Sequence, residues 1–527
     1  MIRIFDISTP DASLTGGGEP RGPGRAVGWA IALLVAARLG LILSGVFNLA
    51  PDEAYFWEWS RHPAFGYYDQ GPAVAWVIRL FTLLFGATEL GVRGGAAFVD
   101  GLTLLLVATL VRRLGGSRRA SLLAVLAMAL TPLGQVNAFL MTYYVPQMLL
   151  WTLVVLTLWE LRDSGGTARS WLALGLWLGL GGLTHHTFLW LGILALAWLL
   201  WTPETRRAFA GPWPWAAAAV AAVVVSPYAI WNAGHDWVGV RHAAALVHLA
   251  QPSWRGVGWS GVLYYVAGQF AVFTPFYLAA GLWAIAGETR EALRGSARGR
   301  LLALATWPLF VYVATLAWAG RSEANWTSAA TLAVAAAWAL HQDRAWRARG
   351  RMPLTVPLCL TTALLVTAAL TGTPLLWRAG LRFRDPSHDP THRLHGWRQL
   401  GLAAYALRES LSVEGPTVTA TVDDYAIPAE LSFYAPDHAM TYCPPLGRRH
   451  HQYDFWPSAA PPLGGNAVWV TRYEIPAGAP VRSLFRTWDP ARAVDVVEPS
   501  SGVLRRRFYL YPCRGFTGPP PDRVRGY

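Results

Sequence analysis

The chain has 527 residues, of which 54% are hydrophobic and only 14% are charged. These proportions are typical of membrane proteins and exclude a chain that stays unfolded in water. The net charge of +13 does not indicate nucleic-acid binding, because the arginines concentrate in short linkers between apolar runs, where basic residues set the orientation of a membrane protein.

A polar tail of residues 1–26, rich in glycine and proline, precedes the first apolar run. No small-residue cleavage site follows this run and more runs come after it, so we interpret it as an uncleaved first transmembrane helix. A helix needs roughly 20 apolar residues to cross a bilayer. About eleven runs within residues 27–376 approach that length, over 27–47, 89–111, 120–139, 145–161, 171–185, 187–201, 213–230, 262–287, 301–319, 326–341 and 353–376.

The first outer loop, residues 48–88, opens with the acidic pair Asp52-Glu53 in a stretch rich in tyrosine and tryptophan. Aromatic residues of this kind prefer the level of the lipid headgroups. Two carboxylates beside apolar surface suit an enzyme that joins a polar acceptor to a lipid-carried donor, although an acid pair alone also fits a solvated loop. Further on, residues 72–85 are apolar but too short to span, so we expect a helix lying in the interface, with Arg79 reaching toward the headgroups.

The linkers between the apolar runs alternate between arginine-rich and arginine-poor. The positive-inside tendency makes the arginine-rich linkers cytoplasmic, which places the N-terminus inside, and the 48–88 loop and everything after residue 376 outside. The stretch 171–201 is too long for one span, so we expect a break after Gly182, with an outer turn at Thr184-His185-His186-Thr187. The arginine-rich linkers contain Arg112, Arg113, Arg118 and Arg119, then Arg206 and Arg207, then Arg290, Arg294, Arg298 and Arg300, and finally Arg344, Arg347, Arg349 and Arg351.

From residue 377 to 527 the composition becomes that of a soluble domain. The spacing of its apolar residues predicts helices over 395–411 and 427–434, and strands over 417–422, 467–472 and 505–511, which together make a small α/β domain. The residues from Gly518 on are interpreted as a tail. Cys443 and Cys513 both lie here and could form a disulfide in an oxidising compartment, but two free thiols are an equally open alternative.

Several motifs resemble one known family. Asp52-Glu53-Ala54-Tyr55, Gly66-Tyr67-Tyr68-Asp69 and Ala75-Trp76 resemble the first outer loop of the bacterial glycosyltransferase 39 / protein O-mannosyltransferase-like family, which includes the 4-amino-arabinose lipid A transferases. The resemblance implies a polytopic helical membrane protein of the GT-C type with a C-terminal periplasmic α/β domain. Later pieces match the same family in order: Trp231-Asn232 with His235, Asn325-Trp326, Gly396-Trp397, Glu430-Leu431-Ser432-Phe433-Tyr434 and Gln452-Tyr453-Asp454-Phe455-Trp456.

The resemblance also implies site residues. Asp52 occupies the position of the family's catalytic acid and is expected to act as the base, with Glu53 as the alternative. The competing interpretation is that Asp52 only caps a helix that begins at Glu53. Asp69 corresponds to a second acid that holds a divalent metal or orients the phosphate, and its neighbours Tyr67 and Tyr68 are counted with it as substrate-binding residues.

The chain departs from the family pattern at three places. Gln70 stands where a charged residue is usual, so the donor phosphate needs another cation, and Arg93 at the outer end of the second span is our first candidate; an arginine that merely snorkels is the alternative. Tyr144 replaces an acid. His185 and His186 replace a Lys-Tyr pair, and at most one of these two neighbours is expected to reach a substrate.

A divalent metal ion is the only cofactor that the resemblance suggests. Asp69 and His242, a histidine of the second long outer loop, are its candidate ligands. Two ligands are few for a closed site, which wants about four.

The leading hypothesis is a glycosyltransferase of the bacterial inner membrane that moves a sugar from a polyprenyl-phosphate carrier to a lipid, glycan or protein acceptor at the outer face, by inverting displacement. Its partners would then be this donor, the acceptor and the membrane lipids. A transporter or flippase for lipid-linked sugar is the main rival. However, transporters place ionisable groups near the middle of the membrane, whereas the acids here lie in outer loops. A catalytically inactive family member is the third hypothesis.

Overall fold

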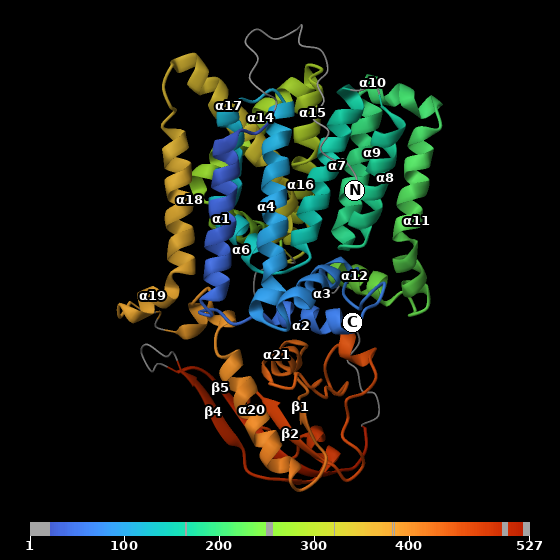
Figure 1. Ribbon diagram of the computed structural model, residues 1–527, viewed down its shortest axis with the longest axis vertical. Helices are drawn as coiled ribbons and strands as arrows, with labels where there is room; N and C mark the ends of the chain where they lie inside the picture. Colours follow the sequence, from blue (N-terminus) through green and yellow to red (C-terminus); the bar gives the residue numbers. More distant parts are fainter. Residues whose placement is uncertain are drawn as a thin grey trace.

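The computed structural model describes residues 22–163, 166–248, 257–320, 322–381, 383, 385–497 and 504–519. The predicted tails at both ends, residues 1–21 and those after Pro519, lie outside this range. Two parts are stacked along the long axis in Figure 1: a bundle of upright helices and, below it, a smaller part that contains the β-sheet.

The bundle contains most of the predicted spans. By length and apolar composition, five helices of the described residues can each cross a membrane, and up to eight spans result if each sharply bent helix pair counts as one. The helical elements of this part are α1 (Arg25–Leu43), α4 (Glu89–Arg113), α5 (Arg118–Leu130), α6 (Pro132–Phe139), α7 (Tyr144–Asp163), α8 (Ala168–Gly182), η1 (His186–Phe188), α9 (Leu189–Trp201), α10 (Pro203–Arg206), η2 (Arg207–Ala210), α11 (Trp213–Ala233), α13 (Trp259–Phe273), α14 (Pro275–Leu293), α15 (Ala297–Leu304), α16 (Trp307–Trp318), η3 (Ala324–Ala330), α17 (Thr331–Arg349), α18 (Thr355–Thr371) and α19 (Thr373–Arg378).

Two predicted single spans are broken by proline. The run 262–287 consists of α13 and α14, which meet at Pro275 with an angle of 102°, and the run 120–139 consists of α5 and α6, which meet at Pro132 with an angle of 75°. Each proline is the first residue of its helix, a position that tolerates proline because its missing N–H would be unpaired there anyway. Each of these two predicted spans is therefore a sharply bent pair of helices rather than one straight helix.

The predicted break within 171–201 is confirmed, because α8 ends at Gly182 and η1 begins at His186. Gly71 packs directly under this turn, and a Cβ atom on Gly71 would lie 2.1 Å from the carbonyl oxygen of Leu183. The same carbonyl accepts a hydrogen bond of 3.1 Å from the N–H of Ala73. Gly71, which follows Gln70, thus has a structural reason, since only a residue without a side chain fits there.

The arginine-rich linkers lie together at the end of the bundle that is remote from the sheet, where α10, α15 and α17 are labelled in Figure 1. Ser117 donates to Asp343 at 2.6 Å, and Arg298 donates to the carbonyl of Leu114 at 3.5 Å, so linkers far apart in sequence contact one another. The alternation of linkers therefore predicted correctly which loops share one side.

The opposite end of the bundle is covered by the first outer loop, which forms α2 (Pro51–Arg61) and α3 (Ala73–Phe85), and by α12 (Val238–His248). Figure 1 shows α3 lying across the lower ends of the upright helices, as the short apolar run predicted. Arg79 is exposed on α3.

The lower part has a mixed sheet in the order β1-β2-β5-β3, with β4 also paired to β5. β1 runs parallel to β2, and the other pairings are antiparallel. The five predicted elements are all present and two strands, β3 and β4, were missed. The elements are α20 (Trp397–Ser412), β1 (Thr417–Ala420), α21 (Ala426–Tyr434), β2 (Asn466–Thr471), β3 (Phe485–Trp488), β4 (Arg492–Val497) and β5 (Leu504–Phe516), with short turns η4 (Pro386–His388), η5 (His392–Leu394), η6 (Gln452–Asp454) and η7 (Pro480–Leu484).

One hydrophobic core joins this part to α2, α3 and α4. Buried residues of these three helices form a single cluster with those of α20, α21 and the sheet. At the junction, the rings of Trp57 and Phe433 meet edge to face at 4.9 Å, and the N–H of Leu49 donates to the hydroxyl of Tyr434 at 2.8 Å. The sheet-containing part is therefore packed against the outer loop rather than tethered beside it.

All three cysteines are free and buried. Of the two alternatives for Cys443 and Cys513, the structure has the free thiols.

Candidate active site

The carboxylate of Asp52 lies at the N-terminal end of α2, where the outer loop meets α21. Asp52 is partly buried, and the phenol of Tyr425 donates a hydrogen bond of 2.6 Å to its Oδ1 atom. Burial, and then the charge of Asp52, raise the pKa of Tyr425, so the phenol stays protonated and remains a donor. Within the described part of the chain no cation lies within ion-pair distance of Asp52. Its carboxylate is therefore free to accept a proton from a bound molecule.

Glu53, the alternative base, is fully buried and its carboxylate is fully used. Arg93 donates to it through Nε at 2.9 Å and through Nη2 at 2.6 Å. The backbone N–H groups of Ala50 and Met141 donate at 2.8 and 2.9 Å. With a guanidinium and two amides on its oxygens, this buried carboxylate has no position left for the hydroxyl group of a substrate, so the geometry does not support Glu53 as a base.

The same contacts change the interpretation of Arg93. Its side chain is buried, and besides Glu53 it donates to the carbonyl oxygens of Phe47 and Asn48 at 3.0 and 2.7 Å. A guanidinium engaged on all three nitrogens has no free edge for a phosphate. Arg93 instead ties the end of α1 to α2 and α4, so neither a phosphate contact nor simple snorkelling describes it.

The capping alternative for Asp52 is also wrong. α2 begins at Pro51, and the side chain that closes its first turn is Glu53, which accepts the hydrogen bond from Ala50. The helix therefore does not use the side chain of Asp52 as its cap.

Asp69 lies on the other side of a pair of stacked tyrosine rings. The phenol of Tyr55 donates to Asp69 at 3.0 Å, and the ring of Tyr55 stacks on that of Tyr425 with centroids 4.5 Å apart. Nε2 of His242 lies 3.4 Å from the other oxygen of Asp69. The structure thus brings together Asp52, Asp69 and His242, which lie far apart in the sequence.

Burial raises the pKa of Asp69 to about 6, with a smaller contribution from the charge of Asp52 and against the opposing charge of Arg449. The folded protein therefore binds a proton at Asp69 more tightly than the unfolded chain does. The stability that this proton contributes is complete below about pH 4 and is lost as the pH rises through about 6.

We expect Asp69→Asn to remove this part of the pH dependence. The melting temperature of the variant relative to the parent should rise between about pH 4 and pH 6 and level off above that, because only over this range does the parent lose the stability that its Asp69 proton contributes. Thermal unfolding in detergent at a series of pH values measures the difference, with Asp236→Asn, an exposed loop acid, as the control. Parallel curves for Asp69→Asn and the parent would contradict the expectation.

Gln70 is buried, and its side-chain nitrogen has no hydrogen-bond partner among the described residues. A buried amide donor without a partner is costly to maintain and is available to a bound oxygen. Tyr67 is different, because its hydroxyl donates to the carbonyls of Trp59 and His62 at 2.9 Å each and accepts from the N–H of Ala64. Tyr67 thus holds the outer loop together and has no group left for a substrate.

Tyr68 is also buried, with its ring 4.9 Å from that of His242. Its N–H donates to the side chain of Gln452 at 2.7 Å. Tyr68 therefore supports His242 and connects the outer loop to the sheet-containing part.

His185 and His186 lie at the turn after α8. His185 stacks on Tyr143 at 4.0 Å and bonds Thr187 at 2.9 Å, while the rings of the two histidines lie 3.7 Å apart. Burial, and then the charges of Asp52 and Glu323, raise the pKa of Tyr143, which places this turn on the same side of the bundle as Asp52. The histidines border the site, whereas Arg79 is exposed on α3 and makes no hydrogen bond or ion pair with the site residues in the described part of the chain.

Sequence reasoning missed two arginines whose charges act on this site, one on Asp69 and one on Tyr425. Arg449 opposes the burial-driven rise in the pKa of Asp69, and Arg393 opposes that of Tyr425. Both are exposed, and no acid pairs with either side chain within the described ranges. Arg449 lies three residues before the motif that begins at Gln452, and Arg393 lies three residues before the motif Gly396-Trp397. The resemblance to the family therefore pointed to both segments but not to the arginines themselves.

No group of three or more histidine, cysteine, aspartate or glutamate side chains in the described chain is arranged to hold a metal ion. Asp69 and His242 are adjacent, as the sequence suggested, but they are two ligands. A metal held there would have to take its other ligands from water or from a substrate phosphate, as Mg²⁺ often does.

Known proteins resemble this chain in sequence. A family model described as dolichyl-phosphate-mannose-protein mannosyltransferase matches residues 69–231. The lipid A galacturonosyltransferase RgtD of Rhizobium johnstonii is 30% identical over 315 residues, which cover 58% of this chain and 63% of RgtD. The undecaprenyl phosphate-alpha-4-amino-4-deoxy-L-arabinose arabinosyl transferase 2 of Pseudomonas fluorescens is 32% identical over 173 residues, 31% of this chain and 30% of that protein. The chain thus spans less than two thirds of these relatives.

Solved structures resemble it over a longer range. ArnT of Cupriavidus metallidurans in the apo state superposes with a TM-score of 0.57 over 93% of this chain and 98% of ArnT, at 15% identity. The structure of the same ArnT bound to undecaprenyl phosphate gives the same TM-score at 16% identity. At these identities the likeness establishes a shared fold.

Proposed function

Because the chain has the GT-C fold of ArnT and its resemblance to the glycosyltransferase 39 / protein O-mannosyltransferase-like family is confirmed, we propose that it is a membrane glycosyltransferase that takes its sugar from a polyprenyl-phosphate carrier. The observation that carries this proposal is the unpaired carboxylate of Asp52. It stands at the end of the bundle beside a second acid, Asp69, and two exposed arginines, Arg393 and Arg449. An acid that is free to accept a proton next to unpaired cations is what transfer from a phosphate requires.

In the proposed reaction, Asp52 removes the proton from a hydroxyl group of the acceptor. The acceptor oxygen forms a bond to the anomeric carbon while the bond from that carbon to the phosphate oxygen breaks, and polyprenyl phosphate leaves with its electron pair. Attack from the face opposite the leaving group inverts the anomeric centre. The phenol of Tyr425 holds the Asp52 carboxylate in place through its 2.6 Å hydrogen bond.

The leaving phosphate gains negative charge and needs donors in fixed positions. Arg393 and Arg449 supply unpaired guanidinium groups in place of Arg93, whose nitrogens are all engaged. The side-chain nitrogen of Gln70 supplies a buried neutral donor. A divalent ion on Asp69 and His242 would add a further positive charge, and loss of transfer in a chelator with recovery on adding metal would identify it.

The named relatives suggest the substrates. RgtD is a lipid A galacturonosyltransferase, and the Pseudomonas relatives use undecaprenyl phosphate-linked 4-amino-4-deoxy-arabinose. We therefore propose an undecaprenyl-phosphate-linked sugar as donor and a lipid A-type glycolipid as acceptor.

The test is transfer by the purified protein in detergent. Synthetic polyprenyl-phosphate sugars carrying galacturonic acid or 4-amino-arabinose are incubated with lipid A, and products are identified by mass spectrometry together with any lipid that copurifies. Product that appears only with enzyme and donor supports the proposal. Donor that binds in stoichiometric amounts but is never consumed with any acceptor would favour a transporter or an inactive relative.

The proposal includes an orientation in the membrane, with the candidate active site at the outer face of the inner membrane and the arginine-rich linkers in the cytoplasm. We expect a cysteine at the exposed position Ala348, at the arginine-rich end of α17, to react with an impermeant thiol reagent only in broken cells. A cysteine at the exposed position Ser458 should react in intact spheroplasts. The three native cysteines are buried and give a low background, and protection of Ser458→Cys in spheroplasts would reverse the orientation.

A further inference from the structure

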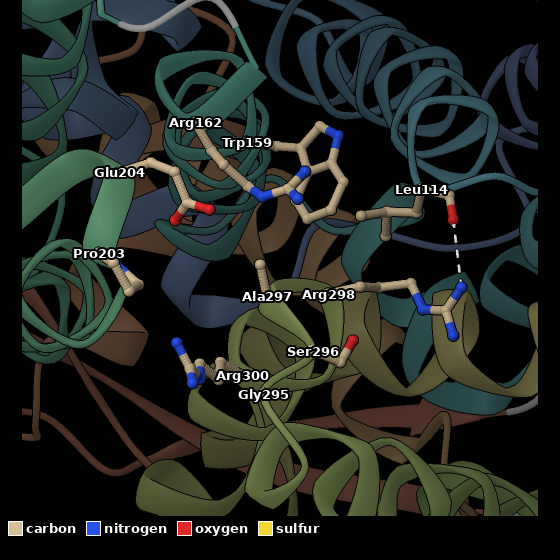
Figure 2. A pocket seen from close by; sticks show the side chains of 10 residues that line it. All are labelled: Leu114, Trp159, Arg162, Pro203, Glu204, Gly295, Ser296, Ala297, Arg298 and Arg300. Atoms are coloured by element: carbon tan, nitrogen blue, oxygen red, sulfur yellow. Dashed lines mark hydrogen bonds between the residues drawn. The ribbon is translucent and has the colours of Figure 1, made fainter. Parts of the chain in front are cut away.

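A polar cavity lies at the arginine-rich end of the bundle, far from the candidate active site. Its volume is about 390 Å³, and it is lined by the C-terminal ends of α4 and α7, by α10 and by residues 295–300, where α15 begins. Figure 2 shows Arg162 and Trp159 of α7 on one wall and Arg298 and Arg300 of α15 on the other, with Glu204 at the side. The proposed sugar transfer uses none of these residues.

The lining side chains carry more positive than negative charge, because three arginines face one glutamate. Arg298 is paired with Glu288 at 3.0 Å, and Arg162 with Asp163 at 2.9 Å. Arg300 donates a hydrogen bond of 2.9 Å to the carbonyl oxygen of Trp201, and no carboxylate pairs with it in the described ranges. The cavity thus holds a guanidinium charge that nothing in this part of the protein neutralises.

Three buried donors at this cavity have no hydrogen-bond partner among the described residues: Nε of Arg162, Nε of Arg300 and the indole nitrogen of Trp159. Buried N–H groups are nearly always paired in folded proteins, so several orphans around one cavity indicate a missing acceptor. The first turn of α15 adds to this, since the helix begins at Ala297 and its positive end lies at the cavity wall.

The surroundings of the cavity indicate what carries the acceptor. Leu293, Leu200 and Trp201 are 78%, 46% and 42% exposed, and the guanidinium of Arg300 lies 5.1 Å above the ring of Trp201. Exposed apolar side chains at the ends of spanning helices face acyl chains, and tryptophans mark the headgroup level. Basic pockets between helices at this depth are suited to anionic lipid headgroups.

We propose that this cavity binds the phosphate group of an anionic phospholipid, with Arg162 and Arg300 as the principal donors. The phosphate oxygens accept from the orphan N–H groups, and the acyl chains lie along the exposed side chains beside the cavity. The site is separate from the donor site and does not depend on the proposed function.

The test measures lipid binding to the purified full-length protein by native mass spectrometry and thermal unfolding, after exchange into a neutral detergent. Dioleoyl-phosphatidylglycerol is titrated in parallel with dioleoyl-phosphatidylcholine and with inorganic phosphate. We expect saturable binding of phosphatidylglycerol and an increase in melting temperature that phosphatidylcholine does not give. An equal effect of inorganic phosphate would overturn the assignment to a lipid.

The variant Arg162→Gln/Arg300→Gln removes both donors, and Arg113→Gln/Arg294→Gln removes two exposed arginines of the same face as a charge-matched control. Loss of a charge-assisted hydrogen bond weakens binding about tenfold, so the first variant should bind phosphatidylglycerol at least about tenfold more weakly than the control. Arg300→Lys, which keeps the charge, should retain part of the binding and reports on folding. Equal affinity of the two double variants would overturn the site.

Discussion

Asp52→Asn is expected to lower the rate of sugar transfer by at least about a hundredfold, the usual cost of removing a general base. The asparagine keeps the size of the side chain and can still accept the hydrogen bond from Tyr425, so α2 and α21 should stay in place. Binding of the donor should be largely retained, because no contact with the phosphate is assigned to Asp52. Turnover and donor affinity measured on the same preparation separate the two effects.

Two further variants make this result specific. Asp236→Asn changes an exposed acid of the same outer surface and should leave the rate of transfer unchanged. Tyr425→Phe removes only the hydrogen bond to Asp52 and should cost less than Asp52→Asn. If Asp52→Asn transfers sugar at the parental rate, the base is another group.

Arg93→Gln is expected to cost about 3–5 kcal/mol of folding stability, since it leaves the buried carboxylate of Glu53 without its cation. On the sequence alone the same change would be read as a loss of donor binding, but the guanidinium is committed to Glu53 and to two carbonyl oxygens. We therefore expect a lower yield of folded protein and a lower melting temperature, and parental donor affinity in the fraction that folds.

The double variant Glu53→Gln/Arg93→Gln tests the reason for this loss. It removes both charges, so its destabilisation should be smaller than the sum of the two single changes. Arg398→Gln breaks a half-exposed ion pair with Glu89 and should cost no more than about 1 kcal/mol. Parental stability of Arg93→Gln with weakened donor binding would restore Arg93 to the phosphate site.

The course of the chain could be predicted well from local pattern. The lengths of the apolar runs, the glycines before residue 183 and the spacing of Leu400, Ala404, Leu407 and Leu411 are local signals, and the elements they predicted are present. Sharp bends at Pro132 and Pro275 were missed, because a proline at the start of a helix and a proline inside a span look alike in an apolar sequence. β4 was missed although Val494 and Val496 stand on either side of Asp495, because six residues between two loops give a weak signal.

The candidate site was only partly predictable, since its members meet through tertiary contacts. The resemblance pointed to Asp52, Asp69 and His242, which the structure brings together. It could not show that Glu53 and Arg93 form an ion pair with each other, because 40 positions separate them in the sequence. An acid and an arginine in this region could equally act as a base and a phosphate ligand. Nor could it show that Tyr425, Arg393 and Arg449 approach the acids from a part of the chain that begins some 340 residues later.

The shared core between the outer loop and the sheet-containing part has a consequence for biogenesis. Asp52 is hydrogen-bonded to Tyr425, and Tyr55 and Tyr68 are hydrogen-bonded to Gln452. The first outer loop is synthesised early, whereas these partners are synthesised near the end of the chain. When the last spanning helix has been synthesised, Tyr425 and Gln452 have not. At that stage Asp52 and Asp69 would lie in a loop that lacks these hydrogen-bond partners. We therefore expect the site around Asp52 and Asp69 to form only after the segment that carries Tyr425 and Gln452 has been synthesised and has folded against the first loop.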